Sequence, residues 1–321
     1  MRLQKKKSSF ALAASAAAIL ALSPAAVLYA VTEDTIERSF SVKPGGTLKV
    51  DTQRGGIEVE GAPGNRVEVK VIREIRNTSR EKAQEIWEKF PVDFRQQGND
   101  VFVTAEYIEK NRLRRFWDDI GRRLRVRFII TVPEVYQLDL KTSGGGISVA
   151  QVEGQILSRT SGGSLNFDAI TGDIRGRTSG GSITIGQVNG DTEVHTSGGS
   201  ITISQARGDV DAHTSGGSIT VHEVMGTIRA DTSGGSIKAT ITRQPQGDCY
   251  LKTSGGSMVV SLAEGIAVDI DASTSGGRVR TDLPVTLQSK AKRNALEAKI
   301  NGGGPDLTLR SSGGSINLKR K

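Results

Sequence analysis

The chain has 321 residues, of which 36% are hydrophobic and only 4% aromatic, while its 39 glycines make about 12% of the chain against a usual ~7%. This composition excludes a conventional layered core, and the regular recurrence of Leu, Ile and Val excludes bulk disorder. The formal charge of +8 falls to +4 without residues 1–30, which hold four of the 43 basic and none of the 35 acidic residues. So small a net charge argues against nucleic-acid binding. The composition is that of a Gly-rich repeat protein.

Residues 1–30 have the order of an export signal. A basic start is followed by the apolar stretch Phe10–Leu22, by Pro24 and by the small residue Ala30. The alternative is an uncleaved inner-membrane anchor, because residues 8–32 carry no charge over a length that can span a membrane. We expect an exported protein of the periplasm, cell surface or medium. Its single cysteine, Cys249, excludes a disulfide framework.

A tetrad, Thr-Ser-Gly-Gly, recurs through the second half of the chain. In a unit such as Asp191–Gly208, apolar and polar residues alternate on both sides of the Gly-Gly pair, which predicts two short strands joined by a corner. A second corner is expected near Gly208. The spacing is 18 residues for six copies and 21 for the last two, which begin at Thr142, Thr160, Thr178, Thr196, Thr214, Thr232, Thr253 and Thr274. We therefore predict an all-β fold, a parallel β-solenoid with one coil per ~18-residue unit and right-handed crossovers.

Stacked coils place equivalent residues about 4.8 Å apart in interior columns. One column follows the corner, in the order Ile147, Leu165, Ile183, Ile201, Ile219, Ile237, Met258, Val279, Ile316. A second lies on the other strand, in the order Leu138, Ile156, Ile174, Thr192, Val210, Ile228, Cys249, Ile270. A third consists of mostly small residues, Ser158, Gly176, Val194, Ala212 and Ala230. The repeated Thr is expected to point inward, and Cys249 to be a buried small hydrophobe.

The repeat divides the mature chain into three parts. Residues 31–72 are expected to form one or two starting coils, residues 73–125 a helix and hairpin insertion, and residues 126–321 the main solenoid, whose last coil closes the stack. In the insertion, Thr78 and Glu81 predict a capping box for a helix that ends before Pro91. A hairpin is expected across residues 97–99. A second helix is predicted from the spacing of Leu113, Phe116, Trp117 and Ile120.

These residues carry a family resemblance. The Thr-Ser-Gly-Gly-Ser units, the early Gly-Gly-Ile-Glu-Val coil at residues 55–59 and the Asn-Gly-Gly-Gly-Pro-Asp-Leu segment at 301–307 resemble the bacterial putative-adhesin family of β-strand-repeat proteins. The resemblance covers roughly residues 40–319. It implies an exported β-solenoid with a poorly defined molecular role and supplies no catalytic residues.

No motif of a known catalytic site is present, so the chain is not expected to be an enzyme and no cofactor is implied. His195 and His213 are 18 residues apart and should stack on adjacent coils, where a shared transition metal is the less favoured interpretation. The outward Ser and Thr of the second strand form a hydroxyl array that could contact a glycan, or simply a solvated β surface.

Basic residues suggest a surface for anionic partners. Residues 110–127 carry eight basic and two acidic residues, and the early coils add more outward arginines. The candidate anion-binding residues are Arg159, Arg175, Arg177, Arg112, Arg114 and Arg115. Anionic envelope polymers, glycans or lipids are the expected partners. The preferred function is a non-enzymatic envelope adhesin or structural solenoid. The alternatives are a polysaccharide-binding or polysaccharide-processing solenoid, with Glu193 and Asp211 as the nearest acid pair, and a membrane-anchored scaffold or sensor.

Overall fold

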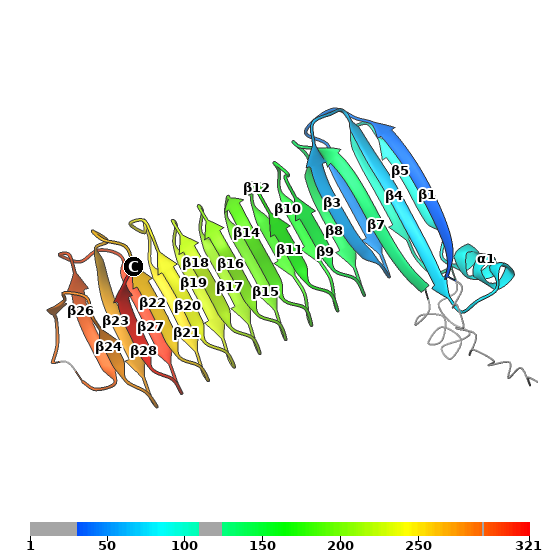
Figure 1. Ribbon diagram of the computed structural model, residues 1–321. Helices are drawn as coiled ribbons and strands as arrows, with labels where there is room; N and C mark the ends of the chain where they lie inside the picture. The colour runs from blue at the N-terminus through cyan, green and yellow to red at the C-terminus, as the bar shows by residue number, and fades with distance from the viewer. Residues whose placement is uncertain (1–30, 109–123, 291) are drawn as a thin grey trace, which may run out of the picture.

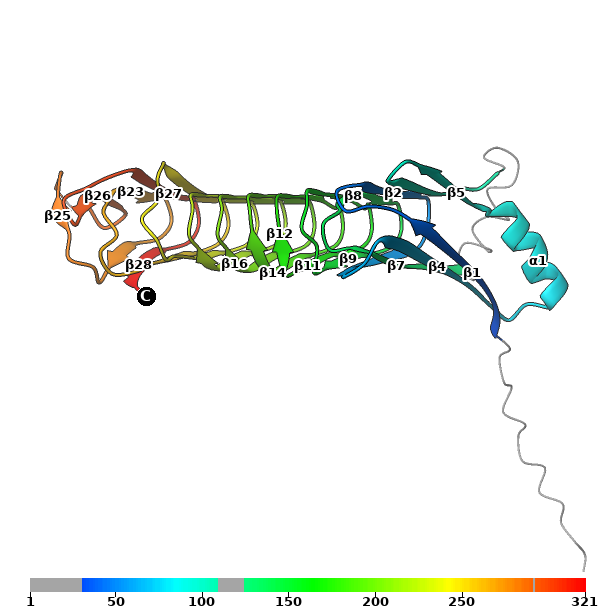
Figure 2. The same cartoon turned by 90° about the horizontal axis from the view of Figure 1, so that it is seen from above.

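The computed structural model describes residues 31–108, 124–290 and 292–321. Two long sheets of 14 strands each lie face to face over this part of the chain, and the coils cross between them (Figures 1 and 2). The predicted β-solenoid is confirmed. No helix in these described ranges is long and apolar enough to cross a membrane.

Sheet A contains the strands that follow the Gly-Gly corners, together with four strands that follow no such corner. In spatial order they are β1 (Val31–Ser41), β4 (Arg66–Arg76), β7 (Leu124–Pro133), β3 (Gly56–Ala62), β9 (Ile147–Ala150), β11 (Leu165–Asp168), β14 (Ile183–Asn189), β16 (Ile201–Ala206), β18 (Ile219–Val224), β20 (Ile237–Ile241), β22 (Met258–Leu262), β28 (Ile316–Arg320) and β24 (Val279–Thr281), with β12 (Ile170–Thr171) beside β14.

Sheet B contains the strands that precede the corners, together with four strands that belong to hairpins. In spatial order they are β5 (Val92–Gln97), β6 (Asp100–Ala105), β2 (Thr47–Thr52), β8 (Gln137–Thr142), β10 (Ile156–Arg159), β13 (Ile174–Arg177), β15 (Thr192–Thr196), β17 (Val210–Thr214), β19 (Ile228–Thr232), β21 (Cys249–Thr253), β27 (Asp306–Ser311), β23 (Val268–Thr274), β26 (Ala295–Ile300) and β25 (Thr286–Leu287).

The tetrad builds each corner by bonding it to the corner of the preceding coil. The Thr196 hydroxyl donates to the Gly181 carbonyl at 2.7 Å and accepts from the Gly199 amide at 3.3 Å. The Thr196 side chain is buried, and these two hydrogen bonds offset the cost of removing its hydroxyl from water. The Ser200 amide donates to the Ser182 hydroxyl at 3.3 Å, which links the outer side of the same corners. The inward position of the repeated Thr is thus confirmed.

The predicted columns form part of the core. Parallel neighbours pair residues 18 apart, as in Ile183 with Ile201 and Ile174 with Thr192. The column residues are buried except Val279, which is partly buried, and Cys249 is only 2% exposed. Burial raises the pKa of the Cys249 thiol, because desolvation disfavours the thiolate. Gly176 in the small column faces Leu165 and Phe167 across the interior, where even a Cβ would lie 3.2 Å from Leu165.

The expected order of the last coils is wrong. The coil of β27 and β28 does not close the stack but lies between the β21/β22 coil and the β23/β24 coil. Ile316 therefore pairs with both Met258 and Val279. The corners follow the same order, since the Thr274 hydroxyl donates to the Gly314 carbonyl at 2.7 Å. The cause is β26, which pairs antiparallel with the far side of β23 and occupies the place of the next coil.

The start of the solenoid also differs from expectation. β2 and β3 form one coil, paired with β8 and β9, whereas β1 and β4 are long antiparallel strands that extend sheet A through β7. Neither β1 nor β4 carries the Gly-Gly pair that a close-packed corner requires. Figure 2 shows this extension curving away from sheet B, with α1 (Arg80–Lys89) across the end of the stack.

The expected helix and hairpin are present between β4 and β7 in the chain. The helix is capped by Ser79 rather than by Thr78, because the Ser79 hydroxyl accepts from the Lys82 amide. Hydrogen bonding to its own backbone amide and to Ser79 lowers the pKa of Glu81. β5 and β6 form the hairpin, and β6 joins sheet B beside β2. The predicted second helix, with Arg112, Arg114 and Arg115, lies outside the described residues.

Arg73 attaches α1 to the open end. Its guanidinium is largely buried, donates to the Trp87 and Phe90 carbonyls at 3.0 Å each, and forms an ion pair with Asp34 of β1. The two carbonyls belong to the C-terminal turn of the helix, where the helix dipole favours a cation. One side chain therefore connects β1, β4 and α1.

We expect Arg73→Ala to lower the free energy of unfolding by about 3 kcal/mol, because Asp34 and two buried carbonyls lose their partner. Arg76→Ala is the matched control, since Arg76 lies exposed on the same strand and should change stability by less than about 0.5 kcal/mol. Urea unfolding followed by circular dichroism measures both. Equal stability of the two variants would contradict this role of Arg73.

Candidate functional site

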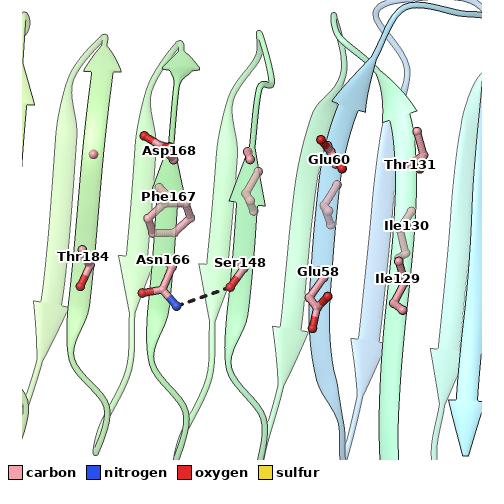
Figure 3. A pocket seen from close by; sticks show the side chains of 14 residues that line it. Glu58, Glu60, Ile129, Ile130, Thr131, Ser148, Asn166, Phe167, Asp168 and Thr184 are labelled. Atoms are coloured by element: carbon pink, nitrogen blue, oxygen red, sulfur yellow. Dashed lines mark hydrogen bonds between the residues drawn. The ribbon is translucent and has the colours of Figure 1, made fainter.

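The candidate site is a groove on the outer face of sheet A. It has a volume of about 670 Å³ and crosses β7, β3, β9, β11 and β14. Four steps between neighbouring strands give it a length of about 19 Å along the solenoid axis. Figure 3 shows Glu58 and Glu60 from β3, Ser148 from β9, and Asn166 and Asp168 from β11 along this face.

Two small residues, Ala150 and Gly186, make the hollow. Ala150 lies between Glu60 and Asp168 in the strand pairing, and Gly186 follows on β14. A Cβ on Gly186 would overlap the Asp168 carboxylate, so the absence of a side chain there gives the carboxylate its place. The next strands of the same sheet have larger residues at this level, Ser204 and His222, both exposed. The groove therefore ends near β14.

The groove carries unneutralised negative charge. Glu58, Glu60 and Asp168 are exposed, and none of them has an ion-pair partner among the described residues. Two cations of the flanking strands β4 and β7 are paired with other acids. Lys70 lies 3.0 Å from Glu37, and Arg127 lies 3.2 Å from Glu74.

Uncharged polar groups continue the groove along the sheet. Glu58 is followed in one row by Ser148, Asn166, Thr184, Thr202 and Thr220. The Asn166 amide donates to the Ser148 hydroxyl at 3.4 Å. The corner serines 182, 200, 218 and 236 form a parallel row beside it. This outer face can donate and accept hydrogen bonds at a regular spacing of about 4.8 Å.

Three of the six arginines singled out from the sequence, Arg159, Arg175 and Arg177, lie on the opposite face of the molecule. Arg159 on β10 lies beside Arg177 on β13 in the strand register, and both side chains project outward from sheet B. Glu193 lies 3.6 Å from Arg175 and 2.8 Å from Arg177, so one carboxylate contacts both. Arg159 has no such partner among the described residues. Anion binding on this face stays a prediction.

This prediction can be tested at one position. Arg159→Glu should weaken co-sedimentation with anionic vesicles and acidic polysaccharide at low salt, because it reverses the one arginine of the three that no carboxylate contacts. We expect a reduction of about threefold, typical of an exposed contact. Arg207→Glu on an exposed position between β16 and β17 is the control. Binding that is unaffected by Arg159→Glu would exclude this face as the anion-binding surface.

The two histidines stack as expected. The rings of His195 and His213 are 4.7 Å apart and nearly parallel, at 6°. Desolvation, followed by the neighbouring His213 and Arg177, lowers the pKa of His195. Because the folded state then binds this proton less tightly than the unfolded state, acidification through the titration of His195 lowers stability. In the described part of the chain, no group of three metal-binding side chains forms around the pair.

One member of the acid pair of the enzyme alternative, Glu193, is engaged by arginines. Glu193 and Asp211 are direct neighbours on β15 and β17, but Glu193 accepts the Arg177 guanidinium.

Sequence reasoning missed the groove. Glu58, Glu60, Ala150, Asp168 and Gly186 were not singled out, although the row of outward residues contained a signal. Positions 150 and 186 are small, where the later coils have Ser204 and His222. The sequence did not indicate that β7 forms one side of the groove, because residues 124–133 have no tetrad that would place them beside β3.

Residues 50–319 match the family model described as Toastrack DUF4097. A search of curated proteins found no match. Among solved structures, a "putative cell adhesion protein" from Clostridium sporogenes is 15% identical, with 90% of this chain and 100% of that chain covered and a TM-score of 0.22. A "putative adhesin" from Bacteroides fragilis is 13% identical over 90% and 97%, with a TM-score of 0.30. A "Putative lipid binding protein" from Parabacteroides distasonis is 10% identical over 90% and 97%, with a TM-score of 0.38.

Proposed function

Because the chain belongs to the Toastrack DUF4097 family, we propose that it is an exported, non-enzymatic adhesin of the cell envelope whose sheet A groove holds an extended polysaccharide. The observation that carries the proposal is the groove itself, about 670 Å³ in volume and continuous with rows of outward hydroxyls. An extended chain of sugars offers hydroxyls at regular intervals, and such a ligand fits a regular array of donors and acceptors.

The construction of the solenoid supports a binding surface of this kind. Every coil is bonded to its neighbours through strand pairing and through the Thr and Ser ladders at the corners, so the outward side chains sit on a stiff lattice. A rigid surface loses little conformational entropy when it binds, which is an advantage for many weak contacts. Affinity is expected to be modest for a single chain and to rise when several copies meet one polymer.

Export is part of the proposal. The basic and apolar order of residues 1–30 supports it, together with a single, buried cysteine that makes the fold independent of disulfide bonds. Cell fractionation followed by N-terminal sequencing of the protein tests it. Recovery of the chain in the cytosol with its first residues intact would contradict export.

The groove is tested by filling it. Ala150→Trp places a large ring between Glu60 and Asp168 without changing the charge, and should reduce retention on purified envelope polysaccharide at least about tenfold, since displaced contacts of 1.4 kcal/mol suffice for that factor. Ser204→Trp is the matched control, because Ser204 lies exposed on the same sheet beyond the groove. Equal retention of both variants and the unmodified chain would refute the groove as the binding site.

A further inference from the structure

We infer that the sheet A groove selects glycans that carry free, protonated amino groups, an inference that rests on the proposed polysaccharide binding. The groove offers three carboxylates, from Glu58, Glu60 and Asp168, with no cation of the described chain paired to them. A neutral glycan would leave these charges unmatched, and an acidic glycan would be repelled. An aminoglycan supplies cations that match these carboxylates and hydroxyls that pair with the polar groups of this face.

The negative charge of the groove is not neutralised by basic residues on the neighbouring strands. Lys70 and Arg127 lie on β4 and β7, the strands that flank the groove, and both are paired with acids of their own extension. Those acids, Glu37 and Glu74, keep the flank from becoming a cationic rim. The arginines of sheet B face the opposite side of the solenoid.

The carboxylates are spaced for a linear polymer. Glu58 and Glu60 are two residues apart on β3, about 6.8 Å along the strand, and Asp168 lies two strands beyond Glu60, about 9.6 Å along the axis. Several ammonium groups of one extended chain can therefore be matched at once. A single amine or a small diamine would meet only part of this arrangement.

The uncharged lining favours a sugar polymer over a cationic peptide. Ser148, Asn166 and Thr184 lie in the row that begins at Glu58, so hydroxyl groups of a ligand find partners between the charges. Ile129 and Ala150 provide flat apolar surface for the face of a pyranose ring. Lysine-rich peptides share the charge but not the hydroxyls, and they serve as a control ligand.

The experiment compares two hexasaccharides of identical linkage, glucosamine and N-acetylglucosamine, by isothermal titration calorimetry with the full chain, in acidic buffer that protonates the amine. We expect the glucosamine hexasaccharide to bind at least about tenfold more tightly, with an affinity that falls as salt rises. The triple variant Glu58→Gln, Glu60→Gln, Asp168→Asn should remove this preference. The control variant Asp211→Asn, Asp231→Asn on sheet B should retain it.

Each outcome decides one point. Equal binding of both hexasaccharides would overturn the amino-group selectivity while leaving polysaccharide binding in place. Binding of neither, nor of purified envelope polysaccharide, would overturn the proposed function itself. Oligolysine binding as tight as the glucosamine hexasaccharide, and equally lost in the triple variant, would replace the glycan with a cationic peptide and so refute the inference. A selectivity that survives the triple variant would place the ligand elsewhere and refute it as well.

Discussion

Gly199→Ala should lower the free energy of unfolding by about 3 kcal/mol or more, because a Cβ at this position overlaps the Gly181 carbonyl of the preceding coil. That carbonyl also accepts the Thr196 hydroxyl, so a shift of the backbone breaks a buried hydrogen bond as well. The backbone of Gly199 does not have a positive φ. The cost is therefore one of close packing between coils, not of backbone conformation.

The other glycine of the tetrad is the control. A Cβ on Gly198 lies 3.5 Å from the Gly180 carbonyl, an ordinary contact, and Gly198 is exposed. Gly198→Ala should leave stability unchanged or raise it by up to about 1 kcal/mol through a lower entropy of the unfolded chain. Urea unfolding of the two variants gives the comparison. Similar losses at both positions would show that the corner is not held by the contact we describe.

Deletion of nine residues from the repeat should prevent folding, whereas deletion of 18 should not. Removing residues 179–196 joins Thr178 to Ser197, so Thr178 takes the place of its equivalent Thr196 and the solenoid becomes one coil shorter. Removing residues 179–187 deletes a corner and most of β14, so the following strand must enter the wrong sheet.

Circular dichroism and thermal melting distinguish the two deletions. The longer deletion should retain a β spectrum and a cooperative transition at a modestly lower temperature. The shorter one should show no cooperative transition. Equal behaviour of the two chains would contradict the pairing of residues 18 apart.

The coils were predictable from the sequence because their determinants are local. Thr196, Gly199 and Ile201 recur in the same order in each unit, and the change of parity across Gly-Gly locates the corner. Repetition then determines which residues lie above one another. Leu138 to Ile228 on sheet B and Ile147 to Ile237 on sheet A follow from that rule alone.

The ends were not predictable in this way. Ile270 and Leu307 have equivalent places in their coils, so periodicity cannot decide which of them follows Cys249. The structure decides through β26, whose antiparallel pairing with β23 depends on contacts distant in the chain. The groove has the same origin, because its flank comes from β7, which returns to sheet A after the hairpin. The repeat period does not predict the pairing of β26 with β23 or the return of β7 to sheet A.

The most direct test of the central claim is carboxyl footprinting of the chain with and without bound envelope polysaccharide. Carbodiimide labelling followed by mass spectrometry reports the accessibility of each exposed acid. Ligand on the outer face of sheet A should protect Glu58, Glu60 and Asp168 and leave Glu193 and Asp211, on sheet B, labelled as before. Protection of the sheet B acids, or none at the groove while the polysaccharide is bound, would contradict the account.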